Sequence, residues 1–403
     1  MGLELRAITD DEVVAFRAAT MTTFGDDHES DPNGPARMRA LLPLAQCWAA
    51  FDGGTIVATA ATIDHGVVLP GGGTLPMAGL TNVIVRPTHR RRGLLRQLVA
   101  IHLEDARRRG LALSGLWSSE ASIYGRFGYG LATESDHLEV ADARTLPLGA
   151  ARELDVTEWA DEARARVALP AIYARAIATR PGALVRSEVW WRERRFLEAP
   201  YMRAGASLRR HVIARRGDEL VGYLQYRQRN AWTDGVASGK IEIVELIGVD
   251  ARSEATLWQF ALQIDLFPNV TWWNAPVDDV LAWSVADGRQ VKRRRVDGLW
   301  IRIDDVPAAL TARTYAADGE LRLCVDGATF ELVVEGGRAV RCAPSTGAPE
   351  LELPRATLGA LYLGGVPASR LARAALVSGT TEVLARADRM LTTTIAPWCP
   401  ELF

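Results

Sequence analysis

The stretch VIVRPTHRRRGLLRQLV, residues 83–99, constrains the fold more than any other part of this sequence. Its first residues, 83–85, are β-branched and apolar, which is typical of a buried strand. From Leu94 to Arg109 apolar residues recur at helical spacing, and Gly110 ends the predicted helix. A strand that runs through a short arginine–glycine loop into a helix predicts a mixed αβ fold.

This basic loop has two interpretations. Backbone N–H groups at a helix start are unpaired and partly positive, and Gly93 lets a ligand approach the backbone closely. Arginines add paired contacts to phosphate oxygens, so the loop would cradle a pyrophosphate. The alternative is a solvated basic face, and the spacing alone does not separate the two. The sequence contains no GxxxxGK[ST] motif, and no GxGxxG with an acidic residue at the right distance.

Composition limits the classes of function. The net charge of −2 over 403 residues argues against a protein that coats nucleic acid, and no apolar run approaches the ~18 residues of a membrane span. The N-terminal segment does not resemble a signal peptide. The cysteines form no CxxC pair and have no histidine at ligand spacing, so we expect no metal site and no disulfide framework. This usage suits a reducing cytoplasm. The four cysteines are Cys47, Cys324, Cys342 and Cys399.

The chain divides into three parts, which we expect to be 1–148, 149–290 and 291–403. The first alternates strands and helices and closes with the strand ESDHLEV. The second repeats the order strand, hairpin, strand, helix, with its helix over 253–265 capped by Ser253, but it lacks the basic loop. We infer an internal duplication whose second copy lost the loop. The third part is a compact α+β unit.

The segment SSEASIYGRFGYG, residues 118–130, places two phenols among glycines about 30 residues after the basic loop. A phenol near a departing thiolate can act as a general acid. On its own, a tyrosine is more often a residue of the core or of an interface, so this segment alone does not assign a role to Tyr124.

The motif V-x-V-x-P-x-H-R-R-R-G-L-L-R, followed by S-E-x-x-I-Y-G-R-F-G-Y-G, resembles the Eis (enhanced intracellular survival) family of the GNAT acetyltransferase superfamily. The resemblance extends through DGLWIRIDDVPAALTAR to the last residue. It implies an α+β fold: a GNAT domain with an acetyl-CoA site over 1–148, a degenerate GNAT-like domain over 149–290, and a sterol-carrier-like domain over 291–403. It also implies a homohexamer.

The same resemblance implies roles for individual residues. The strand at Asn82 to Val85 would offer N–H groups to the pantetheine arm of acetyl-CoA, and the loop would hold the pyrophosphate. Tyr124 would protonate the departing thiolate, and the terminal carboxylate of Phe403 would act as general base through water. The residues that match the acetyl-CoA site are Val83, Ile84, Val85, Arg90, Arg91, Arg92, Gly93, Leu94, Leu95, Arg96 and Ser119.

Three acidic residues, Asp26, Glu120 and Glu401, are the expected acceptor-binding residues. Because acidic side chains attract a polycation, we expect the amine acceptor to be cationic, such as an aminoglycoside. A lysine side chain of a protein or peptide is the alternative within the class. A non-catalytic protein that binds an apolar ligand is the alternative outside it, but such a protein could dispense with the basic loop, Tyr124 and Phe403. We expect no nucleic-acid partner, because the arginine runs lack interleaved aromatic residues. We expect no membrane partner, because no apolar run is long enough to span a membrane.

Overall fold

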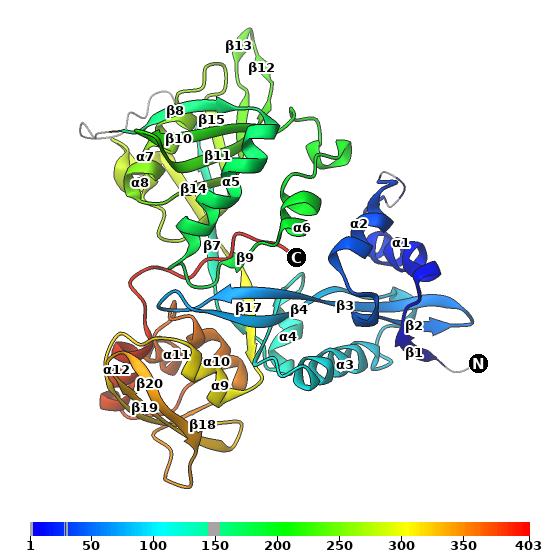
Figure 1. Cartoon of the computed structure of the whole chain (residues 1–403), viewed down its shortest axis with the longest axis vertical. Helices are drawn as coiled ribbons and strands as arrows, with labels where there is room; N and C mark the ends of the chain where they lie inside the picture. The colour runs from blue at the N-terminus through cyan, green and yellow to red at the C-terminus, as the bar shows by residue number, and fades with distance from the viewer. Residues whose placement is uncertain (1–2, 28, 30, 144–153) are drawn as a thin grey trace.

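The computed structural model describes residues 3–27, 29, 31–143 and 154–403, and most of its strands belong to three sheets (Figure 1). The first sheet passes through the middle of the molecule and carries the basic loop. Its spatial order is β1 (Glu4–Ala7), β2 (Cys47–Asp52), β3 (Thr55–Val68), β4 (Thr74–Val85), β5 (Leu113–Trp117), β17 (Leu299–Ile303) and β6 (Gly130–Leu131), with β9 (Leu184–Val185) paired to β3. The stretches FDGGT and PGGG form the β2–β3 and β3–β4 turns.

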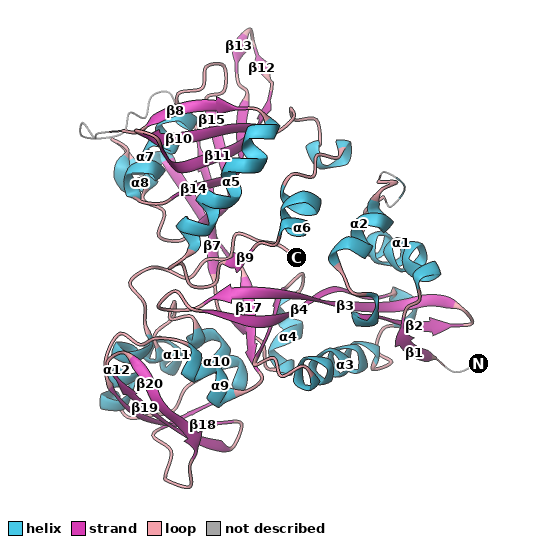
Figure 2. Cartoon of the chain, in the orientation of Figure 1, coloured by secondary structure: helices cyan, strands magenta, loops and turns pink. Residues whose placement is uncertain are grey.

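Helices cover both faces of this sheet (Figure 2). α1 (Val13–Phe24) packs on one face together with α2 (Gly34–Leu41), and α3 (Leu94–Arg108) packs on the other. The buried side of α3 joins the core that contains Leu94, Leu98 and the ring of Tyr124. A short helix, α4 (Ala121–Tyr124), follows β5. The predicted helix of the basic loop is thus confirmed, with its end one residue earlier than expected.

The second sheet is flanked by α5 (Glu162–Ile177), α7 (Ala251–Leu262) and α8 (Leu281–Ser284), and α6 (Glu188–Trp190) lies toward the first sheet. A separate two-stranded hairpin, β12 (Trp232–Thr233) and β13 (Val236–Ala237), extends from it. The order of the second sheet is β16 (Val291–Asp297), β7 (Glu134–Val140), β15 (Asn269–Pro276), β14 (Lys240–Gly248), β11 (Glu219–Arg229), β10 (Arg210–Arg216) and β8 (Val156–Ala160).

The third sheet packs with the helices of the C-terminal part, and its core continues into β5 and β17. Its order is β20 (Arg338–Pro344), β19 (Ala328–Glu335), β18 (Gly319–Val325) and β21 (Leu351–Leu353). The helices are α9 (Val306–Ala312), α10 (Arg355–Tyr362), α11 (Ala368–Arg373) and α12 (Thr381–Leu391). The α+β character expected for this part is confirmed.

The first two sheets exchange strands, which corrects one prediction. The segment ESDHLEV forms β7, but β7 pairs with β15 and β16 of the second sheet and does not close the first. In return β17 enters the first sheet between β5 and β6. The chain crosses at Thr133, whose hydroxyl accepts the N–H of Leu299 at 2.8 Å. Periodicity identifies a strand but not its neighbours, so this exchange could not be predicted from it. The boundaries after 148 and 290 stay predictions.

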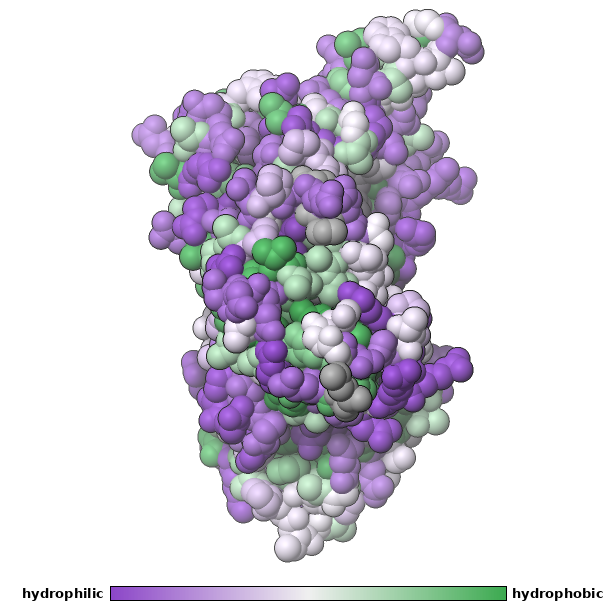
Figure 3. All heavy atoms as spheres, turned by 90° about the vertical axis from the view of Figure 1, so that its right-hand side faces the viewer, coloured by the Kyte–Doolittle hydropathy of each residue, from purple (hydrophilic) through white to green (hydrophobic). Residues whose placement is uncertain are grey.

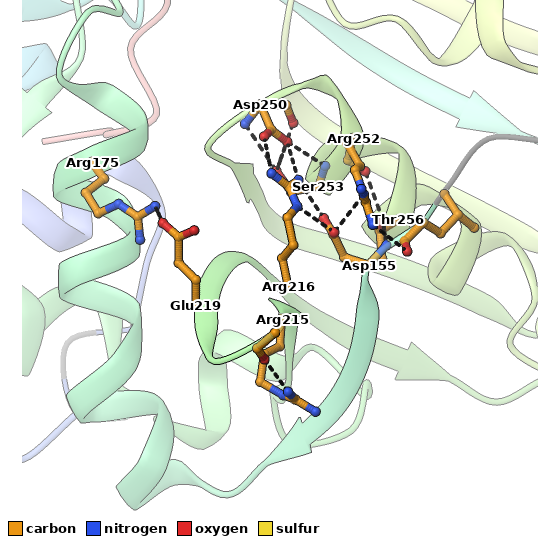
Figure 4. A network of polar contacts seen from close by, with 11 residues as sticks. Asp155, Arg175, Arg215, Arg216, Glu219, Asp250, Arg252, Ser253 and Thr256 are labelled. Carbon is orange, nitrogen blue, oxygen red and sulfur yellow. Dashed lines mark hydrogen bonds and ion pairs between the residues drawn. The ribbon is translucent and has the colours of Figure 1, made fainter.

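In the second unit an acidic side chain of the protein caps the start of α7. Asp250 is the N-cap of α7, and its carboxylate accepts the N–H of Ser253 at 2.9 Å (Figure 4). The prediction of Ser253 as the cap is therefore wrong. Ser253 is the third residue of α7, and its hydroxyl accepts a hydrogen bond from the backbone N–H of Asp250. Arg216 pairs with both Asp250 and Asp155 at 2.9 Å and lowers the pKa of Asp250 to about 2. This helix start carries its own anion, so an anionic ligand finds no place there.

The first and third parts meet at a backbone-to-backbone contact that only glycine allows. A Cβ at Gly130 would lie 1.7 Å from the carbonyl oxygen of Ala356 on α10. We expect Gly130→Ala to destabilise the protein by about 1–3 kcal/mol, because the helix must shift away from β6. Gly125→Ala is the matched control, since nothing lies within 4 Å of its Cβ position. Urea denaturation measures both, and equal midpoints for the two variants would contradict this contact.

Candidate active site

The site begins where two parallel strands part. β4 and β5 pair only from Met77 to Gly79, opposite Leu113 to Gly115. Beyond Gly79, β4 continues to Val85 beside β3 alone. The backbone groups of β4 that face away from β3 therefore have no strand beside them in this stretch. Such unpaired N–H and C=O groups can bind an extended amide-containing ligand as a strand would.

A bulge in β4 marks the same position. Asn82 adopts φ 52°, in the left-handed region that asparagine tolerates better than most residues. The pairing of β3 with β4 shifts register here, and the carbonyl of Asn82 accepts the hydroxyl of Thr59 at 2.6 Å. The bulge turns successive residues of β4 toward different cavities, with Asn82 lining one and Val83 lining another.

The basic loop leads from β4 to the uncapped start of α3. Gly93 is the N-cap residue with φ 80°, Arg91 has φ 64°, and no side chain bonds to the first amides of the helix. The first turn contains no acidic residue. In contrast to α7, no carboxylate among the described residues caps these amides, so the helix start suits a bound phosphate.

A cavity of about 790 Å³ opens over this helix start. Nearly all the predicted acetyl-CoA residues line it; Arg92 does not, and its guanidinium lies 3.4 Å from the carbonyl of Thr88 on the outside of the loop. Glu120, predicted to bind the acceptor, lines this cavity instead. The predicted residues on the wall are Val83, Ile84, Val85, Arg90, Arg91, Gly93, Leu94, Leu95, Arg96 and Ser119. Residues that the sequence analysis missed are Thr23, Phe24, His89, Ile123, Arg126 and Phe127.

Tyr124 ends α4 and lines the same cavity, although its side chain is largely buried. Burial, with a smaller contribution from the Glu120 carboxylate, raises the pKa of Tyr124 to about 12. The phenol therefore keeps its proton at neutral pH and can donate it. Its ring meets that of Tyr129 edge-on, with 6.2 Å between centroids, which fixes its orientation from behind.

A second cavity, of about 490 Å³, lies between α1, α2 and the segment after α6. It shares Phe24 with the first cavity, and the two meet along β4 at Asn82 and Val83. Asp26, Glu401 and Phe403 all line this second cavity. The structure thus brings two of the three predicted acceptor residues together with the predicted general base.

The C-terminal residues 398–403 cross from the third part into this cavity. The ring of Phe403 lies over β4, where a Cβ at Gly79 would come within 2.7 Å of it, and 4.7 Å from the ring of His65. The carbonyl of Leu402 accepts the Arg194 guanidinium at 2.8 Å. Aromatic packing and backbone bonding together hold the last two residues at the cavity wall.

The same segment occupies the place where the strands of the second sheet part. β14 and β15 stop pairing after Ile243 and Trp272. Two residues further along β15, the side-chain amide of Asn274 donates to the carbonyl of Cys399 at 3.1 Å. In the degenerate unit, protein chain therefore lies where the first unit leaves strand edges open.

Glu401 is committed to partners within the protein. Its side chain is buried, it forms an ion pair with Arg186, and it accepts the indole N–H of Trp190 at 2.9 Å. Arg186 also binds Glu245, and that cation, together with Arg195, holds the pKa of Glu245 low against the effect of burial. Asp26, in contrast, is exposed. Of the two acidic residues that line this cavity as predicted, only Asp26 has a carboxylate open to solvent.

Within residues 3–27, 29, 31–143 and 154–403, no group of three or more histidine, cysteine or acidic side chains could hold a metal ion. In the same described part of the chain, none of the helices has both the length and the apolar character needed to cross a membrane.

Comparison with known protein families gives three domain matches along the chain. Residues 4–132 and 182–303 each match an acetyltransferase (GNAT) domain, and residues 306–400 match a sterol carrier protein domain. The predicted fold class, two GNAT-like domains followed by a sterol-carrier-like domain, is confirmed.

Similar whole proteins are known. The chain is 36% identical to an uncharacterized N-acetyltransferase of Streptomyces coelicolor over 86% of each chain. It is 34% identical to the N-acetyltransferase Eis of Mycobacterium tuberculosis over 96% of each chain. The crystal structure of Eis1 from Mycobacterium abscessus superposes with a TM-score of 0.86 at 29% identity, covering 99% of this chain and 100% of that one.

Proposed function

The chain belongs to the Eis family of GNAT N-acetyltransferases, and from this premise we propose that it transfers the acetyl group of acetyl-CoA to a primary amine by direct attack in a ternary complex. Membership of the family makes it an acyltransferase. The observation that carries the rest is the meeting of two cavities on β4, one over an uncapped helix start and one beside the C-terminal residues.

In this proposal the first cavity holds acetyl-CoA. The amides at the start of α3, with Arg91 and Arg96, bind the pyrophosphate, and the open edge of β4 binds the pantetheine arm. The carboxylate of Phe403 takes a proton from the incoming ammonium through water. The amine nitrogen then attacks the thioester carbon, the carbon–sulfur bond breaks, and Tyr124 donates its phenolic proton to the departing thiolate. The proton that the nitrogen loses as it becomes an amide restores the phenol.

The structure limits the identity of the amine acceptor less than it limits the reaction. The expectation of an aminoglycoside rests on acidic residues, but Glu401 is already paired and Glu120 lies in the other cavity. An aminoglycoside and a lysine-containing peptide therefore remain two acceptors to test, and Asp26 is the residue that would favour the first.

Release of CoA thiol from acetyl-CoA, with a panel of aminoglycosides, polyamines and lysine peptides, tests the function. We expect Arg91→Ala and Arg96→Ala each to raise KM for acetyl-CoA about 10-fold, since each removes charged contacts to phosphate. Arg92→Ala is the matched control, because Arg92 does not line the cavity. Equal effects of all three variants, or no binding of acetyl-CoA by the unaltered protein, would contradict the assignment of this cavity.

A further inference from the structure

The second cavity is lined by more basic than acidic side chains, which is unusual for a site that binds amines. Five arginines line it against three carboxylate side chains and the terminal carboxylate of Phe403. Figure 3, which views the molecule from the side of α1 and α2, shows mostly hydrophilic surface with hydrophobic residues gathered around the middle. The charged residues of the cavity are Arg17, Arg37, Arg194, Arg195 and Arg209, with Asp26, Asp31 and Glu401.

Several of these charges are already paired. Asp31 is buried and accepts from both Arg17, at 3.0 Å, and Arg37. One carboxylate thus binds two guanidinium groups. Arg195 is better balanced, because it lies 2.8 Å from Glu245.

Arg194 is different. Its guanidinium donates to the carbonyl of Leu402 and lies over the ring of Trp190, 5.3 Å from the centroid. No carboxylate among the described residues forms an ion pair with it. The side chain is exposed and lines the cavity. Desolvation by neighbouring protein atoms lowers the pKa of Arg194, and the nearby Glu401 carboxylate opposes this shift. A charge in such surroundings is stabilised by a bound anion.

The remaining wall is apolar and aromatic. It includes the rings of Phe16, Trp190, Tyr201 and Trp273, and methionine side chains from α1 and α2. A cavity of this composition excludes water from a bound ligand and strengthens charge–charge contacts inside it. A highly hydrated polycation gains little from such a wall, whereas a partly apolar molecule is buried favourably.

Resting on the acetyl transfer proposed above, we propose that the acceptor is a partly apolar amine that also carries an anionic group, a carboxylate or a phosphate, which Arg194 and the Arg37–Asp31 pair bind. The amine end of such a molecule would lie toward β4 and Phe403, where the two cavities meet. Arg194 is then a specificity-determining residue.

Matched pairs of acceptors test this proposal. The probes are hexylamine against 6-aminohexanoate, benzylamine against 4-(aminomethyl)benzoate, and propylamine against 3-aminopropyl phosphate. Thiol release gives KM and kcat for each, and calorimetry on the CoA-saturated protein gives affinity. We expect the anionic member of at least one pair to bind about 10- to 100-fold more tightly, and comparison of carboxylate with phosphate identifies the anion.

Two variants separate specificity from structure. Arg194→Gln should reduce the preference for the anionic member at least tenfold. Arg192→Gln is the control, because Arg192 lies two residues away, pairs with Glu193 and does not line this cavity. Equal losses on both members of a pair would make Arg194 a support for the C-terminal residues and would overturn the proposal.

The outcomes also distinguish this proposal from the proposed function. If neutral amines bind and react as well as their anionic partners, or if aminoglycosides are preferred, the anion site is wrong and acetyl transfer stands. If the anionic amines bind more tightly than their neutral partners but are not acetylated, the anion site stands. Absence of acetyl-CoA binding would contradict the proposed function itself.

Discussion

Tyr124→Phe is expected to lower kcat by about 10²- to 10⁴-fold while KM for acetyl-CoA changes little. The variant removes one proton donor and leaves the ring, the helix start and the arginines in place. Because burial raises the pKa of Tyr124 to about 12, the phenol stays protonated well above neutral pH. This group should therefore cause no loss of kcat between pH 6 and 10, and a decline should begin only as the pH approaches about 12. Steady-state thiol release across this range measures both effects.

Tyr129→Phe is the matched control for that experiment. Tyr129 is the neighbouring phenol and is fully buried, but it does not line the cavity. We expect this variant to keep kcat within about threefold, since it removes no proton donor from the site. Unchanged turnover in Tyr124→Phe, or an equal loss in both variants, would remove Tyr124 from the chemistry.

Appending residues after Phe403 is expected to lower kcat at least about 100-fold, with KM for acetyl-CoA unchanged. The extension converts the terminal carboxylate into a peptide group and forces more chain into a cavity that Phe403 already lines. The contacts of Glu401 and Leu402 with Arg186 and Arg194 hold the preceding residues, so the end cannot easily move elsewhere. The cofactor cavity is not lined by these residues and should bind as before.

Phe403→Leu separates the carboxylate from the ring. It keeps the terminal carboxylate and loses the packing on Gly79 and His65, so we expect a smaller loss than the extension produces. A tag at the N-terminus is the control, because it also lengthens the chain but leaves the carboxylate of Phe403 unchanged. Normal turnover of the extended protein would show that the base lies elsewhere, and His65, whose pKa burial lowers to about 4, would then be examined next.

The cofactor site could be predicted from sequence because its determinants are local. Val83 to Arg96 form a continuous strand, loop and helix start, and Tyr124 lies in a short glycine-rich segment. Apart from Arg92, the residues predicted to bind acetyl-CoA all lie on one cavity wall together with Tyr124. Local patterns of this kind carry both the geometry and the chemistry.

The acceptor cavity could not be predicted in the same way. Its arginines come from α1, α2 and the segment after α6, so only tertiary packing brings Arg17, Arg37 and Arg194 together. Each is an ordinary solvated charge in the sequence. Likewise the sequence predicts that Glu401 binds the substrate, but in the fold its carboxylate forms an ion pair with Arg186. Acidic positions without their partners are a poor guide to the charge of a cavity.

The exchange of β7 and β17 has a consequence for how this chain can be inherited. A genetic crossover is usually tolerated at a domain boundary, because few contacts span it. Here a crossover between the first two units would combine β7 from one parent with β15 from the other, and β17 with a foreign β5. Both sheets would then contain a mismatched strand. We therefore expect the two acetyltransferase units to be inherited as one piece, although the helix start of the second is closed to phosphate.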